Sequence, residues 1–274
     1  MSNNNAPIGV FDSGLGGLTA VRQLRKILPH ENIVYFGDTG RVPYGMRGTD
    51  TIVQYAKQDI AFLLSHKVKM VIAACGTVSS TLPAAVSTAL PVPYMGVVQS
   101  TAAAAVQATK SGRIGVIGTP ATIHSGSYAA AIRALLPTAE ITATACPLFV
   151  PLVENGYFDK GNPVTTLVAR DYLKACKAAA VDTLILGCTH YPLIKSIIGE
   201  EMGRDVVLID PGKQVAAAAK LLLEQQNLLA DNTCGEADYY VSDSTESFRQ
   251  LGNWFLGEYA GGSVQQISVD GYVL

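Results

Sequence analysis

The stretch IGVFDSG at residues 8–14 runs from a short apolar strand into a hydroxyl residue. The stretch IGVIGTP at residues 114–120 is a weak repeat of the same pattern. A serine or threonine after a strand suits the start of a helix, because its side-chain oxygen accepts a hydrogen bond from the free N–H groups of the first turn. The two stretches therefore predict two similar strand-to-helix units in one chain.

Apolar runs and helical spacing alternate along the chain. Apolar residues from Leu15 to Leu28 recur every three or four positions, and Pro29 then ends this helix. The other predicted helices cover 49–65, 78–89, 99–110, 121–135, 165–179, 193–202, 213–226 and 245–256. The predicted strands cover 8–11, 33–36, 70–74, 94–98, 114–117, 141–145, 184–186 and 206–209. This alternation predicts an α/β fold with mainly parallel sheets flanked by helices.

The composition restricts the class of protein. The chain has 274 residues, 49% hydrophobic and 15% charged, which is typical of a globular protein with a large core. A net charge of −2 and the lack of a Lys/Arg-rich run argue against a nucleic-acid partner. No apolar stretch reaches the roughly 18–20 residues of a membrane span. The polar start MSNNNA is unlike a signal peptide.

The cysteines indicate a reducing compartment. They are odd in number, sparse and without CxxC spacing, which is typical of reduced thiols in a cytoplasmic protein. The five are Cys75, Cys146, Cys176, Cys188 and Cys234. We therefore expect a cytoplasmic protein without disulfides.

Two of the cysteines occupy matching places in the two units. Cys75 ends the apolar run of VIAACGTVSS (71–80), and Cys188 ends that of LILGCTHYP (184–192). In open parallel sheets, ligands bind beyond the carboxyl ends of the strands. Two such units that face each other would direct both thiols into one cleft from opposite sides.

Two thiols that flank one small substrate suit the inversion of a carbon centre. One removes a proton from one face while the other returns a proton to the opposite face, and each is the base in one direction. A helix start after each cysteine would lower the thiol pKa below its usual ~8.5, and Pro192 suits the first turn of the second helix. The alternative is a pair of packed core thiols. The polar neighbours Thr77, Thr189 and His190 favour the chemical role.

Five motifs in this order resemble those of the glutamate racemases, in the cofactor-independent aspartate/glutamate racemase superfamily. They are GVFDSGLGGL (9–18), FGDTGRVPYG (36–45), ACGTVSS (74–80), GVIGTP (115–120) and GCTHYPL (187–193). The resemblance extends from Ile8 to about Asp210. It implies two similar α/β domains with the active site in the cleft between them. Residues 1–97 plus 211–274 would form the first domain and residues 98–210 the second.

The resemblance also implies a role for each matching residue. Cys75 and Cys188 are the implied catalytic acid/base pair, with Asp12 supporting the first thiol and His190 the second. Hydroxyls and backbone N–H groups would hold the substrate's carboxylates and ammonium. The implied substrate-binding residues are Asp12, Ser13, Tyr44, Gly45, Gly76, Thr77, Thr119, Thr189 and His190. Asp38, Pro43 and Glu154 match supporting positions, and an ordinary turn carboxylate is the alternative for Asp38 and Glu154.

One position departs from the family pattern. The family commonly reads Cys-Asn-Thr where this chain has Cys75, Gly76 and Thr77. Gly76 offers the substrate only its backbone N–H and C=O. We expect an asparagine at position 76 to be tolerated if the site keeps the family geometry.

The function implied by the resemblance is interconversion of L-glutamate and D-glutamate, which supplies D-glutamate for peptidoglycan and so supports cell shape. It implies no cofactor and no metal, a small-molecule substrate, and neither a membrane nor a nucleic acid as partner. Family members often associate as homodimers. An aspartate or related amino-acid racemase of the same superfamily is the nearest alternative.

Other classes of protein fit the sequence less well. DSGLGGL hints at a dinucleotide loop, but Thr19 stands where the third glycine belongs. A zinc site on Cys188 and His190, with Cys75 or Asp12, would have unusual ligand spacing. A Cys–His hydrolase leaves Cys75 without a role, and a two-domain amino-acid binding protein needs neither thiol. Exchange of the substrate's α-hydrogen in deuterated water would separate a racemase from the last two.

Overall fold

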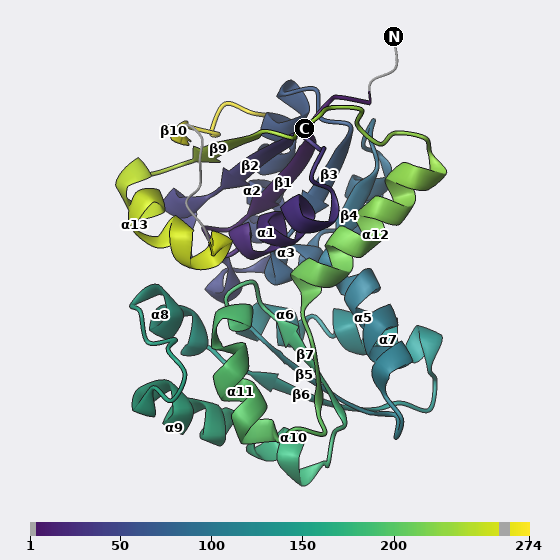
Figure 1. Cartoon of the computed structure of the whole chain (residues 1–274), viewed down its shortest axis with the longest axis vertical. Coiled ribbons are helices and arrows are strands. Elements are labelled where there is room, and N and C mark those ends of the chain that lie inside the picture. The colour runs from purple at the N-terminus through teal and green to yellow at the C-terminus, as the bar shows by residue number, and fades with distance from the viewer. Residues whose placement is uncertain (1–3, 258–263) are drawn as a thin grey trace.

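The computed structural model describes residues 4–257 and 264–274. These residues form two sheets, one above the other in Figure 1, with the strand orders β10-β9-β2-β1-β3-β4 and β6-β5-β7-β8. The larger sheet contains β1 (Ile8–Asp12), β2 (Ile33–Gly37), β3 (Met70–Ala73), β4 (Tyr94–Gly96), β9 (Ala237–Val241) and β10 (Val264–Gln266). The smaller contains β5 (Arg113–Gly118), β6 (Glu140–Ala145), β7 (Thr183–Gly187) and β8 (Val207–Ile209). Every pairing in the described residues is parallel, which confirms the predicted fold class.

Helices connect the strands and cover the sheets. The α-helices are α1 (Leu18–Ile27), α2 (Thr49–Ser65), α3 (Gly76–Thr81), α4 (Ala84–Thr88), α5 (Val97–Ala108), α6 (Pro120–His124), α7 (Ser127–Leu135), α8 (Phe149–Glu154), α9 (Pro163–Tyr172), α10 (Lys174–Ala178), α11 (Lys195–Met202), α12 (Pro211–Gln225) and α13 (Thr245–Leu256). Three short 3-10 helices lie in loops: η1 (Thr39–Arg41), η2 (Tyr44–Met46) and η3 (Tyr191–Ile194). In the described part of the chain, no helix is both long and apolar enough to cross a bilayer.

The central strands are buried on both faces, as expected for parallel strands between helices. All five residues of β1 are buried. Val10 packs in the core cluster that includes Leu18 and Val21 of α1, whereas its neighbour Phe11 packs with Ile60 of α2 in a separate cluster. Successive side chains of a strand point to opposite faces, so α1 and α2 cover opposite sides of the larger sheet.

The polypeptide crosses from the larger sheet to the smaller one at α5 and returns at α12. α5 follows β4 of the larger sheet, α12 follows β8 of the smaller one, and the two helices pack against each other. We propose the domain boundaries expected from the sequence, 1–97 plus 211–274 and 98–210, because each sheet lies within one of these units. Residues 1–3 and 258–263 of the first unit lie outside the described residues.

All eight predicted strands are present, whereas three predicted helices are each divided in two. The helix predicted over 78–89 is interrupted at Pro83, because the residue before a proline avoids the helical region and Leu82 is extended. The one predicted over 121–135 is interrupted at Gly126, whose φ is +67°. The one predicted over 165–179 divides into α9 and α10 at Leu173.

The sequence interpretation missed α8, β9 and β10. In β9, buried Tyr239 and Val241 alternate with residues that are partly or fully exposed. The strand therefore lacks the continuous apolar run by which the other strands were recognised. α8 lies in PLFVPLVENG, where prolines obscure the helical spacing.

Candidate active site

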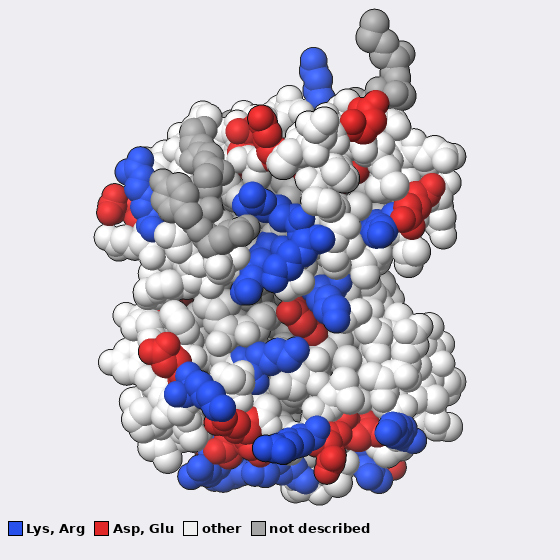
Figure 2. Space-filling model, in the orientation of Figure 1, with Lys and Arg blue, Asp and Glu red and all other residues white. Residues whose placement is uncertain are grey.

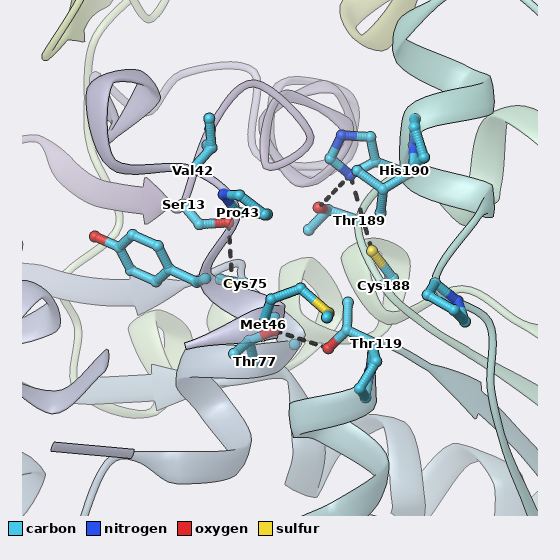
Figure 3. A pocket seen from close by; sticks show the side chains of 18 of the residues that line it. Ser13, Val42, Pro43, Met46, Cys75, Thr77, Thr119, Cys188, Thr189 and His190 are labelled. Atoms are coloured by element: carbon cyan, nitrogen blue, oxygen red, sulfur yellow. Dashed lines mark hydrogen bonds between the residues drawn. The ribbon is translucent and has the colours of Figure 1, made fainter. Parts of the chain in front are cut away.

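The carboxyl ends of the central strands of both sheets face one cavity of about 410 Å³. From the larger sheet β3 leads to Cys75, and from the smaller sheet β7 leads to Cys188. The predicted site residues that line the cavity are Ser13, Pro43, Tyr44, Gly45, Cys75, Gly76, Thr77, Thr119, Glu154, Cys188, Thr189 and His190. Figure 3 shows Cys75 and Cys188 on opposite sides of it. The topology therefore brings both thiols to one site, because the carboxyl edges of the two sheets both face this cavity.

Cys75 is the N-cap residue of α3 and is almost entirely buried. Its thiol lies 3.6 Å from the hydroxyl oxygen of Ser13. Burial, together with the nearby charge of Asp12, raises the pKa of this thiol to about 12. The sequence had led us to expect a lowered pKa at this helix start. That expectation was wrong for Cys75, because desolvation of the thiol outweighs the effect of the short helix.

Asp12 lies behind the cavity wall and does not line it. It ends β1, is fully buried, and its Oδ2 accepts hydrogen bonds from the N–H groups of Gly14 (3.2 Å) and Gly17 (3.0 Å). Burial raises the pKa of this carboxyl above its usual value, although the charge of His190 and these hydrogen bonds act in the opposite direction. Asp12 therefore shapes the loop that carries Ser13 and acts on Cys75 through its charge.

Cys188 belongs to a chain of three interacting side chains. Its sulfur lies 3.8 Å from Nδ1 of His190, and Nε2 of the same ring lies 3.0 Å from a carboxylate oxygen of Glu154. Burial acts to lower the pKa of His190, but the partners Cys188 and Glu154 outweigh it and raise that pKa to about 10. The imidazole is therefore cationic at neutral pH.

The segment after Cys188 differs from the sequence expectation. No α-helix begins directly at this thiol: a turn and η3 come first, with Pro192 in the first turn of η3, and α11 follows. The hydroxyl of Thr189 lies 3.4 Å from the His190 ring nitrogen that faces Cys188. The local partner of the Cys188 sulfur is thus a charged side chain and not a helix N-terminus.

Threonines from the two domains meet beside the thiols. The hydroxyls of Thr77 and Thr119 are 3.0 Å apart across the cleft (Figure 3). The hydroxyl of Thr122 lies 3.0 Å from that of Thr119. Thr119 caps α6, since its side chain accepts a hydrogen bond from the N–H of Thr122. The hydroxyls of Thr77 and Thr119 thus form a polar strip on the cavity wall, and Thr122 supports Thr119 from behind.

Tyr44 and Gly45 reach the cavity from a loop that is held from behind. The hydroxyl of Tyr44 donates to Asp38 and, at 3.1 Å, contacts Asp59 of α2. Arg41 bridges the same two carboxylates, at 2.6 Å to Asp38 and 3.1 Å to Asp59. Asp38 and Asp59 are fully buried, and neither lines the cavity.

Several residues of the site escaped the sequence interpretation. Asp59 could have been noticed, because Ile52, Ala56 and Ile60 mark the buried stripe of α2 and a carboxylate on such a stripe is almost always paired. The apolar residues of the wall carry no chemical signature that would have revealed them: Val42, Met46, Pro147, Val150 and Pro151. Their places depend on how loops from both domains close over the cavity.

The cavity lining contains no lysine or arginine. Basic side chains gather instead on the surface, over α1 on the face shown in Figure 2. An anion in the cavity would therefore depend on the charged ring of His190, on hydroxyls and on backbone N–H groups, such as those of the first turn of α3. Among residues 4–257 and 264–274, no group of three or more His, Cys, Asp or Glu side chains is placed to hold a metal ion.

Comparison with known proteins shows the family. The family model described as Asp/Glu/hydantoin racemase matches residues 19–220. A glutamate racemase from Geobacter metallireducens is 44% identical over 264 residues, which cover 96% of this chain and 97% of that protein. The chain belongs to the glutamate racemases of the Asp/Glu/hydantoin racemase family. The resemblance inferred from the five sequence motifs is thereby confirmed.

Solved glutamate racemases share the two-sheet architecture. One from Bacillus anthracis superposes with a TM-score of 0.92 at 35% identity, covering 97% of this chain and 98% of that one. One from Francisella tularensis, crystallised with D-glutamate, gives a TM-score of 0.91 at 39% identity, covering 98% and 100%. The fold that brings the two cysteines together is thus the fold of these glutamate racemases.

Proposed function

We propose that this chain is an isomerase that interconverts L-glutamate and D-glutamate by proton transfer between two bases at the α-carbon. The observation that carries the proposal is the pair of thiols, Cys75 and Cys188, which line one cavity from opposite sides (Figure 3). The names of the relatives support glutamate as the substrate, and one of those relatives was crystallised with D-glutamate.

The proposed reaction moves two protons and needs no other reactant. A thiolate on one face takes the α-proton, so that the C–H bond breaks, its electron pair stays on the carbon, and an S–H bond forms. The thiol on the opposite face then gives its proton to the carbon and becomes a thiolate. The product has inverted configuration, and the protein is left with its proton on the other sulfur.

The charges around the two thiols support different roles for Cys75 and Cys188. Cys75 keeps its proton at neutral pH, because burial raises the pKa of its thiol to about 12. The cationic ring of His190 lies 3.8 Å from the sulfur of Cys188. We therefore propose that Cys188 is the base towards L-glutamate and Cys75 the base towards D-glutamate, with His190 supporting Cys188 and Asp12 supporting Cys75.

Apart from the charged ring of His190, neutral groups would hold the substrate's carboxylates and ammonium. We propose that the hydroxyls and backbone N–H groups of Ser13, Gly76, Thr77, Thr119 and Thr189 donate to the carboxylates, that hydroxyl oxygens accept from the ammonium, and that Tyr44 and Gly45 complete the wall. Charge-assisted hydrogen bonds to carboxylates are about twice as strong as neutral ones. Asp38 and Pro43 would act by holding the Tyr44 loop, and Glu154 by orienting His190.

The cellular role follows from the proposed reaction. We propose that the protein works in the cytoplasm, acts as a homodimer, and supplies D-glutamate for peptidoglycan. No cofactor, metal, nucleic acid or membrane has a part in this proposal.

A second candidate is a hydrolase that uses Cys188 as a nucleophile. The contact of 3.8 Å between Cys188 and His190 favours it. It gives Cys75 no task, although Cys75 lines the same cavity. Incorporation of deuterium at the α-carbon from deuterated water would favour the racemase, since a hydrolase need not cause it.

The first test is to offer the purified protein L-glutamate and L-aspartate separately, without added cofactor, and to follow the loss of optical rotation. We expect loss with L-glutamate. Faster loss with L-aspartate would move the substrate assignment to the sister racemases. No loss with either amino acid would overturn the proposed activity.

The two-base mechanism is tested by Cys75→Ala and Cys188→Ala. Each should abolish racemisation in both directions while the protein stays folded by circular dichroism, because either direction needs both sulfurs. Full racemisation by either variant would show that its missing thiol has only a packing role. Slow deuterium exchange without inversion should survive selectively, with D-glutamate for Cys188→Ala and with L-glutamate for Cys75→Ala.

A further inference from the structure

Thr19 is a buried residue of the first domain that contacts the segment carrying Cys188 and His190. It lies in the first turn of α1, and its hydroxyl oxygen is 3.1 Å from the carbonyl oxygen of Thr189. Thr189 is the residue between Cys188 and His190, and all three line the cavity, whereas Thr19 does not. The hydroxyl therefore reaches this wall of the cavity from behind and from the other domain.

The carbonyl of Thr189 depends on this hydroxyl for its hydrogen bond. Within residues 4–257 and 264–274, the hydroxyl of Thr19 is the sole donor to that carbonyl. The same hydroxyl lies 2.8 Å from the carbonyl oxygen of Gly16, but that oxygen also accepts from the backbone N–H of Thr19, at 3.0 Å. Removal of the hydroxyl would therefore leave the carbonyl of Thr189, and not that of Gly16, without a partner.

The loop before α1 gives Thr19 a fixed base. Asp12 ends β1, and its Oδ2 accepts hydrogen bonds from two N–H groups of this loop, those of Gly14 and Gly17. Through Thr19, the end of β1 is thus linked to Thr189 in the second domain.

We propose that Thr19 is a positioning residue, whose hydroxyl holds the carbonyl of Thr189 and so fixes the Cys188 thiol and the His190 ring against the first domain. This carbonyl belongs to the planar peptide unit that joins Thr189 to His190, so a rotation of that unit would move the imidazole as well. The consequence for catalysis rests on the proposed two-base racemisation. The local order of the segment does not.

The local order of the segment is measured by amide hydrogen exchange, followed by NMR, which reports local opening. The N–H of Tyr191 donates to the carbonyl of Cys188 at 3.1 Å. The N–H of Leu193 donates to that of His190, also at 3.1 Å. In Thr19→Val, which keeps the shape of threonine but not its hydroxyl, we expect both amides to exchange several-fold faster. Thr19→Ala should agree with it, and Thr19→Ser, which keeps the hydroxyl, should stay close to the parent protein.

Two controls separate this local effect from a general loss of stability. Thr88→Val removes a similar bond, from the hydroxyl of Thr88 to the carbonyl of Ala84 within α4 (2.8 Å), and should leave both amides at the parent rate. The amides of β5, at the centre of the smaller sheet, should be accelerated less than those of Tyr191 and Leu193 in Thr19→Val. Parent rates for Tyr191 and Leu193, or equal acceleration in β5, would overturn the proposal. So would exchange in Thr19→Ser as fast as in Thr19→Val.

The consequence for catalysis is measured with both enantiomers of glutamate in deuterated water. A misplacement of about 1 Å can lower a catalytic rate about 10²-fold, and we expect kcat of Thr19→Val to fall by roughly 10-fold to 10²-fold in both directions. Early deuterium incorporation should fall for L-glutamate, whose proposed base is Cys188. It should stay near the parent rate for D-glutamate, whose proposed base is Cys75.

An equal fall for both enantiomers, or a kcat at the parent value, would overturn the catalytic part of the proposal. If the parent protein does not racemise glutamate, the proposed function is overturned instead. Amide exchange at Tyr191 and Leu193 then still decides whether Thr19 positions the segment.

Discussion

His190 lies between a carboxylate and a thiol, and each of its ring nitrogens faces one of them. Nε2 is 3.0 Å from Glu154 and Nδ1 is 3.8 Å from Cys188. A pKa of about 10 means that both nitrogens carry protons at neutral pH. The positive charge on this wall is thus stabilised by both Cys188 and Glu154, and Glu154 contacts the sulfur only through the imidazole.

Glu154→Gln should lower the pKa of His190 below about 10, because the amide keeps the size of the side chain but not its charge. An NMR titration of the His190 ring measures this directly. The variant should also lower kcat. Glu246→Gln, which removes a carboxylate from a surface pair with Arg249 on α13, is a matched control that should change neither.

The same substitution predicts a pH dependence of stability. The pKa of His190 is higher in the folded protein, about 10, than the ordinary value of 6.5. Its stabilising contribution is therefore fully present below pH 6.5 and is lost as the pH rises through about 10. The difference in free energy of unfolding between parent and Glu154→Gln should be larger near pH 6 than near pH 10. A constant difference would contradict the assignment.

At the scale of elements, the segment η1–η2 depends on α2. It supplies Pro43, Tyr44 and Gly45 to the cavity, and its own short helices cannot hold it in place. Asp59 supports this segment from outside, since it is fully buried on α2, contacts the hydroxyl of Tyr44 and accepts from Arg41. Burial and the neighbouring charge of Asp38 raise the pKa of the Asp59 carboxyl well above its usual value.

Asp59→Ala should destabilise the protein and loosen this wall of the cavity. Losing a buried hydrogen-bond partner costs about 1–3 kcal/mol, and the freed loop should raise KM for glutamate more than it lowers kcat. Urea unfolding and steady-state kinetics measure the two effects. Asp59→Asn, which keeps an acceptor for Arg41, should retain most of both. An alanine variant with the parent's KM would show that the loop holds its shape without α2.

At the scale of the whole molecule, a buried ion pair joins distant parts of the chain. Nζ of Lys69 lies 2.5 Å from Glu31, and the two side chains are 1% and 2% exposed. Lys69 also donates to the carbonyls of Asn4 (2.5 Å) and Leu228 (2.7 Å), and Glu31 accepts from the N–H of Ala230 (2.8 Å). The pair therefore ties the N-terminal segment and the segment after α12 to the larger sheet.

Lys69→Met should cost about 3–5 kcal/mol of unfolding free energy, because it leaves the charge of Glu31 buried without a partner. The double variant Lys69→Met with Glu31→Gln should recover a large part of the loss. Neither residue lines the cavity, so kcat below the melting temperature should stay at the parent value in both. A single variant as stable as the parent would show that water reaches Glu31 at little cost.

Local sequence determined much of the fold and many of the residues that line the cavity. Strands β1 to β8 were predictable because they are short apolar runs between polar loops, and the bounds of α2 and α13 follow from helical spacing alone. The motifs around Cys75 and Cys188 revealed the shared cavity because parallel strands end at the same edge of a sheet. Each of these signals lies within a few residues of the feature that it predicts.

Only the tertiary structure decided which residues of the site contact one another and in which direction their pKa values shift. The support of His190 by Glu154, 36 positions away, and the contact of Thr19 with Thr189 depend on how distant segments approach, which no local pattern encodes. The thiol of Cys75 shows the physical reason most directly. A short helix start favours the thiolate, but removal from water raises the pKa to about 12, and burial is a property of the assembled fold.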